Sequence, residues 1–142
     1  MLKKLRTGFV YGLIGFGASW FITVLFILAG QNPSDVIVEK EVTFLLLLET
    51  LILAPFGEEF IFRFIPIKTV QRLTSSKTVL WITIISTSVL FGAIHGSLEH
   101  IFIQGTGGII LSIAFLKGGY WTSVTAHTTH NLMAMLLVIF FS

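Results

Sequence analysis

Apolar runs long enough to cross a lipid bilayer recur along nearly the whole of this 142-residue chain. A helix of about 20 apolar residues spans the hydrocarbon core of a bilayer, which is about 30 Å thick. Only 11% of the residues are charged, whereas soluble domains carry about 25%. The polar stretches between the runs are too short for a separate soluble domain. We therefore expect one integral-membrane domain, residues 1–142, folded as an all-α, multi-pass helical bundle.

The apolar runs predict five helical segments, at residues 9–29, 42–64, 78–96, 105–118 and 120–141. The first is longer than the apolar part of a secretory signal, so we expect a retained helix. In the second, Pro55 and Gly57 predict a break or a kink, with the helix restarting at Glu58. Polar loops are expected at 30–41 and 97–102, and a turn at Ser75-Ser76.

Basic residues lie beside the apolar runs and report the topology. They flank the first helix, the turn after the second and the end of the fourth, as Lys3, Lys4, Arg6, Lys68, Arg72, Lys77 and Lys117. The positive-inside rule places these flanks and the N-terminus in the cytoplasm. We expect a multi-pass protein of a prokaryotic cell membrane. A net charge of +2 without a continuous basic face argues against a nucleic-acid partner, and the absence of cysteine excludes disulfides and thiolate chemistry.

A few ionisable residues lie inside the apolar runs, where a charge costs at least about 2.5–3.5 kcal/mol. Glu59 and Arg63 are four residues apart, so they share a helix face and can form an ion pair. We expect this pair to be structural, since buried pairs usually are. The adjacent Glu58 points about 100° away. The two glutamates therefore need not have the same role.

Two later runs carry polar residues at the same spacing. Phe91 and His95 are four apart, and so are His127 and Asn131. A rise of about 1.5 Å per residue brings these pairs and Glu59 to similar depths, so we expect them to converge. The other polar residues receive structural interpretations: His100 as a solvated loop residue, His130 as a hydrogen-bonding partner of a neighbouring helix, and Glu49 as facing the same cavity or bonding a neighbour.

In order along the chain, these residues form the patterns EExxxR, FxxxH and HxxxN, with Ala-Pro shortly before the glutamates. This combination resembles the CPBP family, the CAAX proteases and bacteriocin-processing enzymes also called Abi proteins. The resemblance covers roughly residues 46–135. Phe64 stands where members often have glycine, and Pro66 then threatens the helix. Members commonly carry more helices, so the chain resembles a minimal core of the fold that a homo-oligomer or a larger membrane-protein complex would complete.

The resemblance implies a metal-independent, glutamic-type intramembrane endopeptidase without a cofactor. Its substrate would be a peptide or membrane protein, with or without a lipid modification. Glu58 and His95 would activate a water molecule, and His127 and Asn131 would donate hydrogen bonds to the oxyanion. Supporting roles would fall to Glu59, Arg63 and Phe91.

Two other functions remain open on the sequence. Histidine and glutamate also bind zinc, and His95, His127 and His130 are candidate ligands of a zinc-dependent membrane protease. The HExxH pattern is absent, however, and Asn131 would be a poor zinc ligand. The other alternative is a non-enzymatic subunit, or an assembly or immunity factor of a membrane complex, that retains the protease fold.

Overall fold

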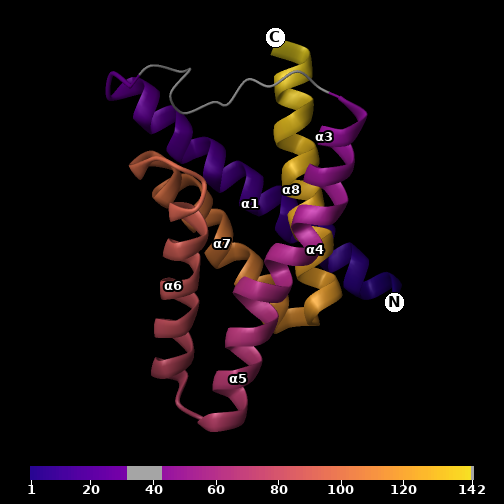
Figure 1. Ribbon diagram of the computed structural model, residues 1–142, viewed down its shortest axis with the longest axis vertical. Helices are drawn as coiled ribbons and strands as arrows, with labels where there is room; N and C mark the ends of the chain where they lie inside the picture. The colour runs from indigo at the N-terminus through magenta and orange to yellow at the C-terminus, as the bar shows by residue number, and fades with distance from the viewer. Residues whose placement is uncertain (32–42, 142) are drawn as a thin grey trace.

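The computed structural model describes residues 1–31 and 43–141 (Figure 1). Within these residues the chain is helical and forms five helical segments, as predicted. Four of them are α1 (Leu2–Leu28), α6 (Lys77–Ala93), α7 (Leu98–Gly118) and α8 (Tyr120–Phe141). Of the described helices, α1, α7 and α8 are long and apolar enough to cross a membrane, and α6 is a shorter apolar helix. Most of the predicted loop at 30–41 lies outside the described residues.

The second segment is one irregular helix made of five consecutive elements. These are α3 (Phe44–Leu48), the π-helical turn η1 (Glu49–Leu53), α4 (Ala54–Glu59), the π-helical turn η2 (Phe60–Phe64) and α5 (Ile65–Leu73). The helix therefore runs unbroken through Glu58 and past Pro66, so the predicted restart at Glu58 is wrong, and so is the threat attributed to Pro66. We call this segment, residues 44–73, the π-containing helix.

Each proline of the π-containing helix lies two residues beyond a π turn, Pro55 after η1 and Pro66 after η2. Proline has no N–H to donate, and its ring crowds the carbonyl four residues earlier. A π turn widens the helix and joins residues five apart. The N–H of Ala54 bonds to Glu49 O, and that of Ile65 bonds to Phe60 O, at this longer spacing. The helix therefore passes both prolines without a break.

The predicted turn at Ser75-Ser76 joins α5 to α6, and the Ser76 hydroxyl caps α6 by accepting a hydrogen bond from Val79 N. The loop predicted at 97–102 is shorter than expected, because α7 already begins at Leu98. Ser97 caps that helix by accepting from His100 N. His100 is consequently buried in the first turn of α7, and its ring Nδ1 lies 2.9 Å from the Ser97 hydroxyl. Its interpretation as a solvated loop residue is wrong.

Helix α1 packs across α7 and α8 along a row of small buried residues, which we call the α1 seam: Gly8, Gly12, Gly15, Ser19 and Thr23. A Cβ atom added at Gly12 would lie 2.5 Å from the carbonyl oxygen of Ala126 in α8. Close backbone approach of this kind is how helices associate in lipid, where no hydrophobic force drives them together. The α1 seam thus covers the side of α8 away from the π-containing helix.

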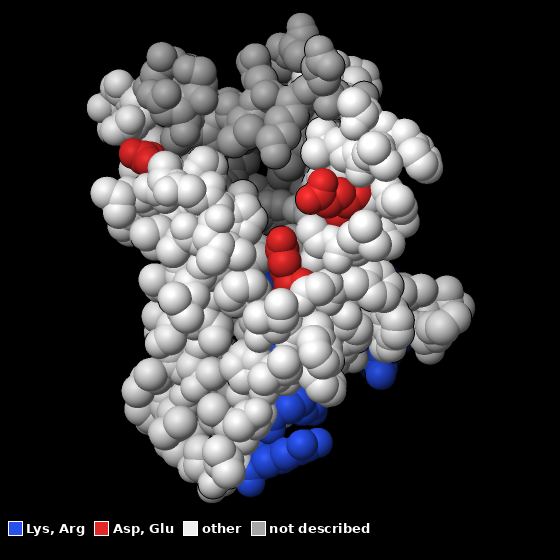
Figure 2. All heavy atoms as spheres, in the orientation of Figure 1, with Lys and Arg blue, Asp and Glu red and all other residues white. Residues whose placement is uncertain are grey.

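The fourth run was expected to begin at residue 105, but α7 begins at Leu98, and its glycines lie within the helix at packing contacts. Gly105 lies near the backbone of Ser88, and in α6 a Cβ added at Gly92 would lie 2.6 Å from the Cα of Ile101. Helices α6 and α7 therefore pack closely along their length. In Figure 1 the π-containing helix descends to the Ser75-Ser76 turn, and α6 returns beside it. In Figure 2 the protruding Lys and Arg side chains lie below the Asp and Glu side chains.

Candidate active site

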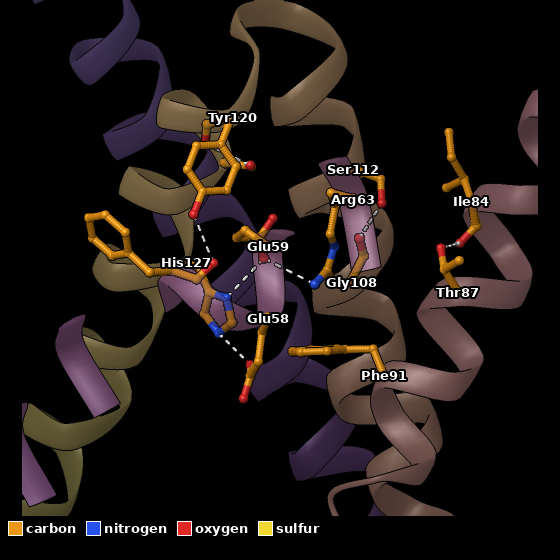
Figure 3. Close-up of polar contacts among 12 residues, drawn as sticks. Glu58, Glu59, Arg63, Ile84, Thr87, Phe91, Gly108, Ser112, Tyr120 and His127 are labelled. Atoms are coloured by element: carbon orange, nitrogen blue, oxygen red, sulfur yellow. Dashed lines mark hydrogen bonds and ion pairs between the residues drawn. The ribbon is translucent and has the colours of Figure 1, made fainter. Parts of the chain in front are cut away.

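Glu59 is the centre of a buried polar cluster between the π-containing helix and α8. Its side chain is completely buried. Its Oε1 atom lies 3.0 Å from Arg63 Nη1 and 2.9 Å from His127 Nδ1 (Figure 3). The ion pair expected between Glu59 and Arg63 is thus present, and both partners are buried. Glu59 therefore links a cation of its own helix to a histidine of α8.

His127 connects the two glutamates. Its Nε2 atom lies 3.6 Å from Oε2 of Glu58, while its Nδ1 atom bonds to Glu59 (Figure 3). Glu58 differs from Glu59 in its surroundings, because a quarter (25%) of its side chain remains exposed. The two carboxylates were expected to point in different directions, and they also differ in how deeply they are buried. Only Glu58 of the two is open to solvent or substrate.

Each ring nitrogen of His127 faces one of the two glutamates. An ionised carboxylate only accepts hydrogen bonds, so Nδ1 of His127 must donate to Glu59. A neutral imidazole then has a lone pair on Nε2, which faces a carboxylate oxygen of Glu58. Two acceptors facing each other at 3.6 Å need a proton on one of them, or a donor between them. The Glu58 carboxylate therefore faces the ring nitrogen of His127 that is not bonded to Glu59.

Phe91 of α6 forms one wall of this cluster. Its ring lies 4.3 Å from the guanidinium carbon of Arg63, a cation–π contact, and 5.6 Å from the ring of His127. His95 lies just beyond the end of α6, with its ring 4.8 Å from that of Phe91. The structure thus gathers Glu58, Glu59, Arg63, Phe91 and His127 in direct contact, with His95 beside Phe91.

The orientation of His95 is set by the backbone. Its Nδ1 atom lies 2.7 Å from the carbonyl oxygen of Phe91, and a carbonyl can only accept. Nδ1 therefore carries the proton, and neutral His95 has its lone pair on Nε2. This tautomer is suited to accept a hydrogen bond from water. The expected i, i+4 relation to Phe91 is kept, although α6 ends at Ala93.

Asn131 and a neighbouring threonine bind the backbone of the π turn η1. Asn131 Nδ2 donates to Thr50 O at 2.9 Å, and the Thr128 hydroxyl donates to Leu51 O at 3.0 Å. The sequence prediction included Asn131 but missed Thr128. The signal for Thr128 is Pro55, which cannot donate to the carbonyl of Leu51, four residues earlier.

The remaining polar residues lie apart from this cluster. His130 faces α1, where its ring contacts Phe16 edge-on, and no described residue bonds its Nδ1 atom. Glu49 is exposed at the start of η1. In the part of the chain that the structure describes, no three His, Asp or Glu residues lie close enough together to hold a metal ion.

Comparison with known families gives one match. Residues 40–133 match the family described as type II CAAX prenyl endopeptidase Rce1-like, and this range includes every residue of the cluster. No curated protein and no solved structure matches the chain.

Proposed function

The chain belongs to the Rce1-like family of type II CAAX prenyl endopeptidases, and on this premise we propose that it is a metal-independent, glutamic-type intramembrane endopeptidase. The observation that carries the proposal is the contrast between its two glutamates. Glu59 is buried against Arg63 and His127, whereas Glu58 retains an exposed carboxylate beside the same histidine. A buried ion pair that supports an accessible base fits water-activating chemistry.

In the proposed reaction, Glu58 and Nε2 of His95 hold the attacking water. Glu58 takes a proton from the water, whose oxygen attacks the scissile carbonyl carbon. The C–N bond then breaks, and Glu58 returns the proton to the leaving amine. One water is consumed, and no covalent enzyme intermediate forms. Glu59 holds His127 in the orientation that keeps Nε2 toward Glu58.

The oxyanion of the tetrahedral intermediate needs hydrogen-bond donors already in place. His127 supplies one such donor when its Nε2 atom carries a proton. Asn131 supplies another, because its amide has two N–H groups and the bond to Thr50 O occupies only one. Removing one such donor typically lowers kcat by about 10²–10³-fold. Arg63 and Phe91 support this arrangement from the opposite side of Glu59.

The deciding experiment compares two conservative substitutions in protein reconstituted in lipid vesicles. Glu58→Gln keeps the size and polarity of the side chain but removes the base, so cleavage should fall by orders of magnitude at an unchanged Tm. Glu59→Gln weakens the pairing of Arg63 and should mainly lower the Tm. The probe is a fluorescence-quenched peptide ending in a prenylated CAAX sequence, which is the substrate class that the family description gives.

Two results would contradict this proposal. Normal cleavage by Glu58→Gln, with a stable but inactive Glu59→Gln, would mean that Glu59 is the base and Glu58 the supporting residue. One bound zinc ion per chain, lost together with cleavage on chelation, would favour the zinc-dependent alternative. Under the proposed mechanism, elemental analysis finds no stoichiometric zinc and chelators leave cleavage unchanged.

A further inference from the structure

We propose that Thr128 is a positioning residue for the reaction, because it replaces the backbone donor that Pro55 lacks and so fixes η1 against α8. The proposal rests on the function proposed above and adds a residue outside the three sequence patterns. It concerns how the helix that carries the glutamates is held in register with the helix that carries His127.

The match between donors and acceptors is specific. The N–H of a residue at position 55 would bond to the carbonyl of Leu51 in an α-helix and to that of Thr50 in a π-helix. Pro55 has no N–H, so neither bond can form. These same two carbonyls accept hydrogen bonds from α8, Leu51 O from Thr128 and Thr50 O from Asn131. Side chains 77 and 81 residues away along the chain therefore satisfy the acceptors that the proline leaves open.

These two hydrogen bonds lie close to the catalytic side chains along both helices. Thr128 is the residue after His127 in α8, and Pro55 is one helical turn before Glu58 and Glu59. The hydrogen bond between Glu59 and His127 joins the same two helices. A backbone anchor at Leu51 thus fixes how far the π-containing helix can slide or rotate against α8. The Glu58–His127 distance of 3.6 Å depends on that register.

The Tyr120 hydroxyl, at the N-terminal end of α8, donates to Phe56 O at 2.8 Å and joins the same two helices. Tyr120 also contacts the rings of Phe56, Phe60 and Phe64, so its loss would remove packing as well as a hydrogen bond. Thr128 is the better probe. Valine has nearly the same shape as threonine, so Thr128→Val removes the hydroxyl and little else.

The first measurement is steady-state cleavage of the quenched prenylated peptide in lipid vesicles. Thr128→Val should lower kcat about 10- to 100-fold while KM changes less than about twofold, because misalignment affects the transition state more than substrate binding. Thr128→Ser keeps the donor and should restore most of the activity. Thr125→Val is the matched control, since among the described residues the Thr125 hydroxyl bonds only to Trp121 O of its own helix, and it should behave as the wild type.

The second measurement is a double-mutant cycle on the Tm with Pro55→Ala, which supplies an N–H for Leu51 O. Thr128→Val should lower the Tm of the wild type, and most of that loss should disappear in the Pro55→Ala background. An equal loss in both backgrounds, or a Thr128→Val protein with wild-type kcat, would overturn the proposal. If the wild type cleaves no peptide, the cycle still decides: a coupled loss supports the anchor while the proposed function fails.

Discussion

Arg63 makes two contacts of different kinds with one planar group. Its Nη1 atom lies 3.0 Å from Oε1 of Glu59, and its guanidinium carbon lies 4.3 Å from the centre of the Phe91 ring. A guanidinium can bond in its plane and stack on its face at the same time, whereas the compact ammonium of lysine cannot do both equally well. The identity of the cation therefore matters here as much as its charge.

Replacement of Arg63 by alanine should destabilise the fold before it affects chemistry. The change leaves Glu59 as a buried carboxylate paired only with His127, and breaking a buried pair costs about 3–5 kcal/mol. We expect a lower yield of folded protein, a lower Tm and reduced cleavage. Arg63→Lys keeps the charge but weakens the cation–π contact with Phe91, so its Tm should lie between those of the wild type and Arg63→Ala. A fully stable, fully active Arg63→Ala would contradict the buried pair.

The pairs within one helix could be predicted from the sequence, and those between helices could not. The contact between Glu59 and Arg63 follows from a spacing of four residues on one helix. The bonds from His127 to both glutamates depend on how α8 is rotated against the π-containing helix, which periodicity does not determine. His95 was placed inside a helix, but α6 ends at Ala93, and the backbone at Gly96 takes a φ of +118°.

At the scale of elements, Gly12 of the α1 seam has no room for a larger residue. A Cβ at Gly12 would meet the Ala126 carbonyl oxygen and Thr129 Cβ, both at 2.5 Å, and a backbone atom cannot rotate away. Helix α1 would have to move off α8. Such overpacking typically costs about 1–3 kcal/mol.

We therefore expect Gly12→Ala to lower the Tm in detergent by a clear margin. Gly17 of the same helix is the matched control, because a Cβ there meets nothing within 4 Å. Gly17→Ala should leave the Tm unchanged or raise it, since alanine favours a helix over glycine by about 1 kcal/mol. Equal Tm values for the two variants would mean that α1 does not pack as closely as described.

The number of helices could be predicted from the apolar runs, but their irregularities and one of their ends could not. Proline lacks an N–H, so Pro55 was interpreted as a break or a kink. The hydroxyl that donates to Leu51 O belongs to Thr128, 77 residues later, and the sequence pattern does not show that the two residues meet. The start of α7 was placed too late, because residues 97–102 were interpreted as a polar loop and the helix was expected to begin at Gly105. In the fold the glycines at 105, 107 and 108 are buried within α7, and Ser97 caps the helix well before them.

At the scale of the whole molecule, the described basic flanks predict which end faces the cytoplasm. The chain has no cysteine, so single cysteines can be labelled without background. Ser75→Cys places a thiol in the exposed turn between α5 and α6, and Gln31→Cys places one at the exposed far end of α1. A membrane-impermeant maleimide should label Gln31→Cys in intact cells and Ser75→Cys only after permeabilisation. The reverse pattern would invert the topology.

The α1 seam has a further consequence for how the molecule chooses its alignment. Its small residues recur at successive helical turns, at 8, 12, 15, 19 and 23, so sliding α1 by one turn, about 5.4 Å, sets small residues against α8 again. The row is therefore degenerate: it favours close approach but not one particular offset. Two particular contacts remove the degeneracy: within the row, the Ser19 hydroxyl donates to Ile103 O at 2.9 Å, and beside the row, Phe16 meets His130 edge-on. The glycines of the row thus permit close approach, whereas Ser19 and Phe16 determine the offset between the helices.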